Sequence, residues 1–207
     1  LGDVYKRQPM LSLDKTKDRE VLREFIGEHK TLLSWKLDGL TIVLTYENGG
    51  LAKAVTRGNG VTGEVVTNNA RVFKNVPLKI PYQGRLVLRG EAIITYSDFE
   101  RINESIEDVD AKYKNPRNLC SGSVRQLNNE ITAERHVHFM AFALVSAPEQ
   151  DFENSRIRQM EWLKEQGFEV VEYKAVTKNN LDEAMQYFST KIETNDFPSD
   201  GLVALYD

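Results

Sequence analysis

Residues 32–57 read LLSWKLDGLTIVLTYENGGLAKAVTR, and the fold class follows from this stretch. Three apolar strand patterns succeed one another here, at residues 32–37, 41–47 and 51–57. Asn48-Gly49-Gly50 separates the last two, and these residues tolerate the positive φ angles of a tight hairpin turn. Consecutive strands joined by a hairpin predict an antiparallel sheet rather than the regular βαβ alternation of a parallel one.

Helical and strand patterns follow each other irregularly along the rest of the chain. A capping box at residues 97–100 opens one helix, and Gly167 ends another. Helices are predicted at 14–30, 155–166 and 181–192, with a short one that ends at 71 and another that starts at 97. Further strands are predicted at 85–95, 138–145, 168–173 and 202–206. Residues 115–127 are predicted to form a loop with a short helix. This order predicts an α+β fold with antiparallel sheets and flanking helices.

Composition restricts the class of protein. The chain has 207 residues, 41% of them hydrophobic and 28% charged, as in an ordinary globular protein. Its net charge of −4 gives no general attraction for nucleic acid, so any such contact needs a local basic patch. Cys120 is the single cysteine, which excludes an intramolecular disulfide and fits a reducing cytoplasm. No apolar run reaches the roughly 20 residues that a membrane span needs.

The two ends of the chain have unusual patterns. Residues 1–8 lack an initiator methionine and a clear period, and we interpret them as a non-native or disordered leader. At the other end the chain stops directly after the apolar run 202–206. We therefore expect a piece of a longer protein.

Lys36 lies where the first strand pattern gives way to Asp38-Gly39. A rigid sheet would fix the position of such a lysine while its side chain projects from the strand end, which suits a covalent nucleophile. Its amine would have to be freed of the proton that a surface lysine carries at pH 7. Taken alone, the motif favours a structural role in which Lys36 pairs with Asp38. The other polar clusters of the chain reverse that preference.

Three further polar clusters stand at strand ends, strand interiors and loops: Thr56-Arg57-Gly58, Arg89-Gly90-Glu91, and residues 115–126. The glycine of the second would permit close approach of another backbone or a planar ligand. The structural alternatives are a surface Arg/Glu pair on an edge strand for the second cluster and a capped loop with solvated arginines for the third. Together, a lysine, several arginines and a glutamate predict a site for an anionic, hydroxyl-rich ligand such as a nucleotide.

Other motifs carry less weight. The sequence has no P-loop, and Gly58-x-Gly60-x-x-Gly63 fits the Rossmann spacing in a region with no clear βαβ unit. His136 and His138 flank one residue, which is not the spacing of a helical ligand pair, so we predict no metal site. Cys120 has no obvious histidine partner, and we interpret it as inert.

An ordered series of sequence blocks spans nearly the whole chain. It comprises PMLSL at 9–13, KLDGL at 36–40, YENG at 46–49, TRGNGVTGE at 56–64, NNAR at 68–71, VPL at 76–78, RGE at 89–91, NPRN at 115–118, GSVRQL at 122–127 and DGLV at 200–203. With these blocks the chain resembles the adenylation (nucleotidyltransferase) domain of NAD-dependent DNA ligases of the bacterial type, from Pro9 to about Tyr206. Lys-x-Asp-Gly alone would also admit ATP-dependent ligases and capping enzymes. The TRG and the NPRN with RQL blocks look specific to the NAD-dependent group.

The resemblance implies an ATP-grasp-like adenylation domain over residues 9–207, truncated at its C-terminus, and a reaction. Lys36 would attack the α-phosphorus of NAD, release nicotinamide mononucleotide and keep AMP as a phosphoramidate, with Mg²⁺ assisting. In the full enzyme the AMP passes to the 5′-phosphate of nicked double-stranded DNA, and the 3′-hydroxyl then displaces it. This chemistry serves replication and repair.

The resemblance also assigns residues. Lys36 and Asp38 are catalytic by this reading, with Asp38 orienting the lysine and helping to place the metal. The residues implied in binding NAD or AMP are Ser12, Leu13, Arg57, Glu91, Arg117 and Arg125. No residue is assigned as a dedicated metal ligand. A cytoplasmic monomer without membrane contact is expected, and the fragment alone is not expected to ligate.

The chain departs from the family pattern at three places. Ser34 stands where the family has a glutamate near the adenine, Leu205 where it has a phosphate-binding lysine, and Asn59 where it has an aspartate. Two alternatives therefore stay open. One is an ATP-dependent ligase or capping-type nucleotidyltransferase, and the other is a catalytically impaired ligase-like domain that binds nucleotide.

Overall fold

The computed structural model describes residues 10–11, 16–57 and 63–207. The strands are β1 Met10–Leu11, β2 Thr31–Leu37, β3 Leu40–Glu47, β4 Gly50–Thr56, β5 Leu86–Ile93, β6 His138–Ser146, β7 Tyr173–Val176 and β8 Ser199–Tyr206. The helices are α2 Thr16–Ile26, α3 Thr67–Ala70, α4 Tyr96–Ser105, α5 Pro116–Val124, α6 Asn129–Glu134, α7 Arg156–Glu165 and α8 Leu181–Lys191, with a 3-10 turn at Val109–Ala111.

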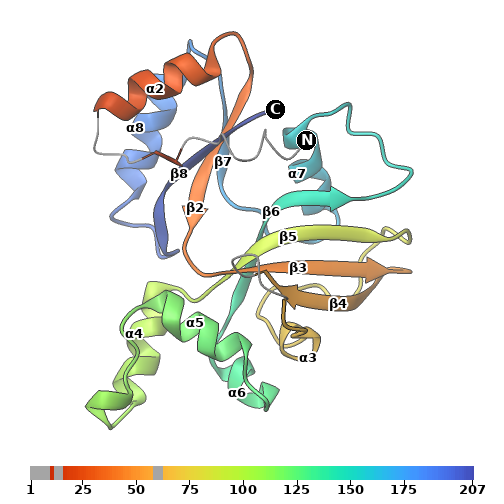
Figure 1. Cartoon of the computed structure of the whole chain (residues 1–207), viewed down its shortest axis with the longest axis vertical. Helices are drawn as coiled ribbons and strands as arrows, with labels where there is room; N and C mark the ends of the chain where they lie inside the picture. Colours follow the sequence, from red (N-terminus) through yellow and green to blue (C-terminus); the bar gives the residue numbers. More distant parts are fainter. Residues whose placement is uncertain (1–9, 12–15, 58–62) are drawn as a thin grey trace.

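The strands form two antiparallel sheets. Sheet A has the order β1-β8-β2-β7, and sheet B has the order β4-β3-β5-β6. Figure 1 shows α2 and α8 on one side of sheet A, whereas α3 to α6 lie beside sheet B at the opposite end of the molecule. The predicted α+β class with antiparallel sheets and flanking helices is confirmed.

The chain passes from sheet A to sheet B through Asp38 and Gly39, the two residues between β2 and β3. Gly39 packs directly on β5, because a Cβ at this position would lie 2.0 Å from the carbonyl oxygen of Ala92. Only glycine allows so close an approach between backbones. The Lys-x-Asp-Gly run therefore joins the two sheets and brings the end of β2 against sheet B.

The hydrophobic side chains form two clusters, one on each side of sheet A. The smaller cluster joins β2 to α2 and α8, and in it the rings of Trp35 and Phe188 meet edge to face with centroids 5.0 Å apart. The larger cluster fills sheet B and its helices and includes Leu32 of β2. Successive side chains of a strand point to opposite faces. Leu32, Ser34 and Lys36 therefore face sheet B.

The local turn chemistry follows the sequence, with one correction. Asn48 and Gly49 have φ angles of 51° and 79°, which confirms the predicted hairpin turn between β3 and β4. The N-cap of α4 is Thr95, whose hydroxyl accepts from the Asp98 amide at 3.2 Å, and not Ser97 as the predicted capping box had it. The helix begins two residues earlier because Thr95 supplies its own Thr-x-x-Asp pattern.

The strand predicted at 168–173 is wrong. Residues 169–171 instead run beside β6, where the Ala141 amide donates to the carbonyl of Glu169 and the Val171 amide donates to the carbonyl of Ala141. Pairing with β2 starts only at Tyr173, which lies opposite Ser34. The apolar pattern reflects burial of Phe168 and Val171 rather than a strand of sheet A.

Within the described ranges, none of the helices has both the length and the apolar character that crossing a membrane requires.

Candidate active site

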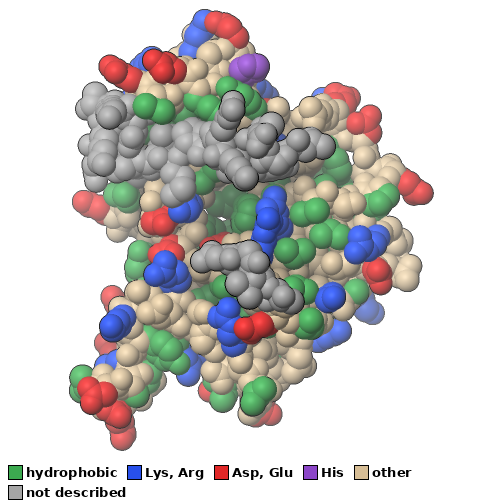
Figure 2. All heavy atoms as spheres, in the orientation of Figure 1, with side chains coloured by type: hydrophobic (Ala, Val, Ile, Leu, Met, Phe, Trp, Pro, Cys, Tyr) green, Lys and Arg blue, Asp and Glu red, His purple; other side chains and the backbone are tan. Residues whose placement is uncertain are grey.

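A cavity of about 350 Å³ lies where the two sheets meet. Figure 2 shows the surface hollowed at this place, with hydrophobic side chains inside and lysine and arginine side chains nearby. Its size is at the lower end of the roughly 300–1,000 Å³ typical of small-molecule sites. The lining residues come from β2, β3, β5, β6, α7, β8 and the segment before β7: Leu32, Ser34, Trp35, Lys36, Leu37, Thr41, Arg89, Glu91, Phe142, Ala143, Arg156, Val171, Val203 and Leu205.

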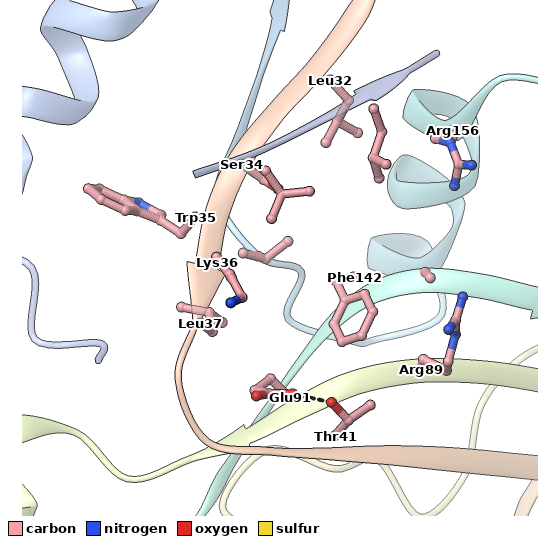
Figure 3. A pocket seen from close by; sticks show the side chains of 14 residues that line it. Leu32, Ser34, Trp35, Lys36, Leu37, Thr41, Arg89, Glu91, Phe142 and Arg156 are labelled. Carbon is pink, nitrogen blue, oxygen red and sulfur yellow. Dashed lines mark hydrogen bonds between the residues drawn. The ribbon is translucent and has the colours of Figure 1, made fainter. Parts of the chain in front are cut away.

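Lys36 projects from the end of β2 into this cavity (Figure 3). Its Nζ lies 3.4 Å from a carboxylate oxygen of Asp200, the second residue of β8. Both side chains are partly exposed, so the ion pair is a weak one. The structural interpretation from sequence, a Lys36–Asp38 pair, is wrong, because the lysine pairs with Asp200 on the neighbouring strand.

Asp38 is held at the junction between the sheets. Its amide donates to the carbonyl of Pro198 at 2.8 Å. Its carboxylate lies 3.7 Å from the Arg117 guanidinium at the start of α5. The structure therefore brings the fourth sequence cluster, which begins at Asn115, next to the Lys-x-Asp-Gly run.

Glu91, on β5, lines the cavity beside the junction between the two sheets (Figure 3). Its carboxylate accepts from the Thr41 hydroxyl at 2.7 Å and from the Gly39 amide at 3.1 Å. Burial, assisted by the negative charges of Asp38 and Asp200, raises the pKa of Glu91 to about 7 against the effect of these hydrogen bonds. Three carboxylates thus lie close enough to Lys36 or to each other to interact.

The surface-pair interpretation of Arg89 and Glu91 is wrong. Strand β5 is an inner strand between β3 and β6, and both side chains line the cavity. The glycine between them does not make room for a ligand. A Cβ at Gly90 would lie 2.3 Å from the ring of Phe139, so the glycine accommodates that ring.

The three predicted arginines lie apart from the cavity floor. Arg57 follows β4 and is exposed, with its amide donating to the carbonyl of Thr41 at 2.8 Å. Arg117 contacts Asp38, as described above. The Nε of Arg125 donates to Glu64 at 3.1 Å, and its guanidinium also contacts the Ser121 hydroxyl. None of the three is among the described residues that line the cavity.

Ser12 and Leu13, predicted to border the adenosine, lie outside the described residues, as do Gly58 and Gly60 of the discounted glycine motif and Asn59. Ser34 and Leu205, the other two departures from the family pattern, both line the cavity from adjacent strands.

The remaining candidates stay outside the site. In the part of the chain that the structure describes, no group of three or more His, Cys, Asp or Glu side chains is placed to hold a metal ion. His136 instead lies 3.4 Å from Asp98. Cys120 is fully buried, and burial raises the pKa of its thiol well above the usual range. Its Sγ contacts the carbonyl of Ala92 at 3.2 Å.

Sequence reasoning did not single out Asp200, Thr41 or Phe142 as site residues. Asp200 had a usable signal, because Asp200-Gly201 repeats the Asp-Gly of the β2–β3 junction beside an apolar strand. Thr41 and Phe142 had none, since a threonine and a phenylalanine in strands are ordinary sheet residues.

Comparisons with known proteins agree on one family. The family model described as the NAD-dependent DNA ligase adenylation domain matches residues 1–207. A DNA ligase of Ruminiclostridium cellulolyticum is 64% identical over 97% of the chain, and one of Lachnoclostridium phytofermentans is 64% identical over 96%. A DNA ligase of Clostridioides difficile is 35% identical over 98%. The chain spans only 30–32% of the length of these relatives. The chain therefore belongs to the family of NAD-dependent DNA ligase adenylation domains.

Proposed function

We propose that this chain carries out the self-adenylation step of an NAD-dependent DNA ligase, with NAD as the substrate and Lys36 as the nucleophile. One observation carries the proposal. Lys36 projects from a strand end into a cavity at the junction of two sheets, beside Glu91 and Asp200. Such an arrangement gives an amine a fixed position next to groups that can bind a polar, hydroxyl-bearing ligand.

The proposed step forms one bond and breaks one. The unprotonated Nζ of Lys36 attacks the α-phosphorus of the adenylate half of NAD. A P–N bond forms, the P–O bond to nicotinamide mononucleotide breaks, and the amine gives up its remaining extra proton to solvent or a carboxylate. Asp200 is one such carboxylate, since its oxygen lies 3.4 Å from the Nζ.

The cavity residues have separate roles in this proposal. Glu91 is fixed by Thr41 and Gly39, which orients its remaining acceptor capacity toward ribose hydroxyls. Asp38 holds Arg117 near the nucleophile, where a guanidinium can bind phosphate oxygens. Arg57 and Arg125 contribute positive charge from farther out. In-line transfer of a phosphoryl-type group depends on this kind of positioning and charge neutralisation.

Mg²⁺ fits this site only together with the substrate. The described residues form no cage of three carboxylates or imidazoles. Mg²⁺ characteristically binds to one or two carboxylates and completes its shell with water and substrate phosphates. Asp38 and Asp200 are the carboxylates near Lys36 that could provide such contacts. When bound, the ion would neutralise charge on the phosphates.

Nick sealing is proposed for the protein that contains the remaining parts of the relatives, since this chain spans about 30% of their length. The net charge of −4 provides no general attraction for a duplex, whose affinity depends on phosphate neutralisation. The 207 residues alone are therefore not expected to seal DNA. A cytoplasmic monomer acting in replication and repair is the setting that this activity implies.

Peptide mapping after incubation with adenine-labelled NAD tests the proposal. The protein is the R. cellulolyticum DNA ligase in which this chain replaces the matching region. Label on the Lys36 peptide, absent in Lys36→Ala, is the expected result. Lys53→Ala, which removes an exposed lysine from β4, is the matched control and should keep full label. Full labelling of Lys36→Ala would overturn the assignment.

The alternatives give different outcomes in the same experiment. Labelled ATP in place of NAD should leave the protein unlabelled, and labelling by ATP alone would favour the ATP-dependent class. A domain that binds nucleotide without catalysis is favoured by Ser34 and Leu205, the two departures from the family pattern that line the cavity. Binding of AMP with no covalent label from either substrate would select that reading.

A further inference from the structure

The pairing of β2 with β8 is irregular at the reacting lysine. The register shifts between two pairs of residues, Trp35 with Leu202 and Leu37 with Ser199. Between these pairs β8 has one residue more than β2. A bulge of this kind aims a side chain but interrupts the hydrogen-bond ladder. The ladder alone therefore does not fix Lys36 relative to β8, so contacts outside it must contribute.

One such contact comes from residues 195–198, which precede β8 and which we call the β8 entry segment. The carbonyl of Pro198 accepts the Asp38 amide hydrogen bond of 2.8 Å described above. Pro198 is buried, and its ring fixes one backbone angle of the segment. The entry segment thus holds Asp38 directly, and it leads within two residues to Asp200, the partner of Lys36.

Asp196 attaches the entry segment to the first turn of α4. Its carboxylate accepts from the Ser97 amide at 3.0 Å and from the Ser97 hydroxyl. Its carbonyl accepts from the Tyr96 amide at 3.0 Å. The first amides of a helix have no partner within the helix, and the helix dipole favours a carboxylate at this end. The Thr95 hydroxyl takes the Asp98 amide, and Asp196 takes the two amides before it.

The first turn of α4 is in turn fixed to sheet B. Only Ile94 and Thr95 separate α4 from β5, and both are buried. Glu91 stands three residues before Ile94 on the same strand. Asp196 therefore connects the strand that carries Glu91 with the strand that carries Asp200. It does so from outside the cavity, because it is exposed and is not among the described residues that line the cavity around Lys36.

We propose that Asp196 is a positioning residue for self-adenylation, which holds the β8 entry segment on α4 and so sets where Asp38 and Asp200 lie relative to Lys36. The proposal deepens the proposed function, on which it rests. A misplacement of about 1 Å at a reacting centre can cost roughly a hundredfold in rate. Since Asp196 does not line the cavity, its loss should slow the reaction while the contacts to the nucleotide stay in place.

The rate of adduct formation over a range of NAD concentrations tests the proposal, in the R. cellulolyticum ligase that carries this chain. Asp196→Ala should lower the rate at saturating NAD by about tenfold and keep the half-saturating NAD concentration within about threefold. Asp196→Asn should keep the rate within about threefold of the original, because its amide can accept from the Ser97 amide and donate to the Ser97 hydroxyl. Asn128→Ala removes the side-chain cap of α6 and is the matched control, which should keep the original rate.

Hydrogen–deuterium exchange at the Asp38 amide gives a second readout that does not depend on activity. In Asp196→Ala this amide should exchange at least about tenfold faster, because its acceptor on Pro198 is no longer held in place. The amides within β3 should exchange as in the original protein. Loss of global stability would instead speed exchange in both places.

The outcomes separate this proposal from the proposed function. A saturating rate of Asp196→Ala within about twofold of the original overturns the proposal, and so does unchanged exchange at Asp38. An equal loss of rate in Asn128→Ala also overturns it, because the effect would then be a general one of helix capping. If the original protein forms no adduct, the proposed function fails, and exchange at Asp38 decides whether Asp196 holds the entry segment. If Asp196→Ala does not fold by circular dichroism, Ser97→Ala replaces it and should show a smaller loss in the same direction.

Discussion

The two ends of the cavity differ in how their residues are held. At the charged end, Lys36, Glu91 and Asp38 each have partners on other elements, and these partners come from β8, β3 and α5. The other end, which we call the neutral end, is lined by Leu32, Ser34, Val203 and Leu205. There Leu32 lies between Leu205 of β8 and Ala175 of β7 in the strand registers. Substitution at the charged end should therefore change chemistry and binding together, whereas substitution at the neutral end should change which ligand fits.

The largest effect expected from this contrast is at Lys36. Lys36→Arg keeps the charge but presents a guanidinium that stays protonated and cannot act as the nucleophile. Formation of the labelled adduct should fall by at least about a thousandfold, which corresponds to roughly 4 kcal/mol in the barrier. The rate of adduct formation by quenched-flow labelling measures it. Leu205→Met at the neutral end should stay within about threefold of the original rate, and an equal loss in both variants would remove the contrast.

Glu91 and Arg57 test the binding side of the charged end. Loss of a hydrogen bond to a charged group costs roughly 1.5–3 kcal/mol, so Glu91→Ala should weaken AMP binding by about 10- to 100-fold. Arg57→Ala removes positive charge from farther out and should weaken AMP binding by less than about tenfold. A surface ion pair would contribute only about 0–1 kcal/mol to stability and nothing to binding. Titration calorimetry measures the affinity. Unchanged AMP affinity in both variants would return the two residues to a structural role.

Gly39 tests whether the junction itself holds the charged end in place. A Cβ on Gly39 would lie 2.0 Å from a backbone oxygen that cannot move away easily, so Gly39→Ala should lower the free energy of unfolding by about 1–3 kcal/mol. Gly122→Ala in α5 is the matched comparison. Its Cβ would lie at an ordinary 3.5 Å from the Tyr113 ring and should raise stability by about 0.5–1 kcal/mol. Urea denaturation measures both, and a stabilising Gly39→Ala would contradict the tight junction.

The smallest effect is the pH dependence of stability. Glu91 has its pKa raised to about 7 in the folded protein, so the folded state binds the extra proton between about pH 4.5 and 7. The stability contributed by protonated Glu91 is present at low pH and is lost as the pH rises through this window. The original chain should therefore lose Tm relative to Glu91→Gln between pH 5 and pH 8.

Glu172 provides the control of opposite sign. Burial alone would raise its pKa, but hydrogen bonds from Tyr187 and Trp35, with the charges of Lys191 and Lys174, outweigh burial and lower it. Its contribution is present at neutral pH and is lost as the pH falls through its lowered pKa. Glu172→Gln should therefore cost Tm at pH 7 and less near pH 3. A Glu91→Gln profile parallel to that of Glu172→Gln would show that the pKa of Glu91 is lowered rather than raised.

Sheet B was predictable from the sequence because its first strands are neighbours along the chain. The turn residues Asn48 and Gly49 stand between β3 and β4 in the sequence and predict the hairpin, and β5 follows as an apolar run. Sheet A is assembled from segments near residues 10, 31, 173 and 199. No local signal states which of these lie side by side. For the same reason the start of β7 was misplaced, since an apolar segment buried beside β6 has the same pattern as a strand.

The candidate site divides in the same way. Lys36 and Glu91 could be singled out because each places a charge in an otherwise apolar strand. Their contacts with Asp200, Thr41 and Gly39 depend on how the two sheets pack against each other. No local sequence pattern states that arrangement. The roles of Ser12, Leu13, Arg57, Arg117 and Arg125 stay predictions.

The Asp38-Gly39 junction also determines how the site is held. It is a two-residue connection between the strand that carries the lysine and the sheet that carries Glu91. The chain crosses between the sheets a second time before β7, where residues 169–171 are hydrogen-bonded to Ala141 of β6. Backbone contacts at both crossings, including the close approach of Gly39 to the Ala92 carbonyl, therefore set the position of the reacting amine relative to Glu91.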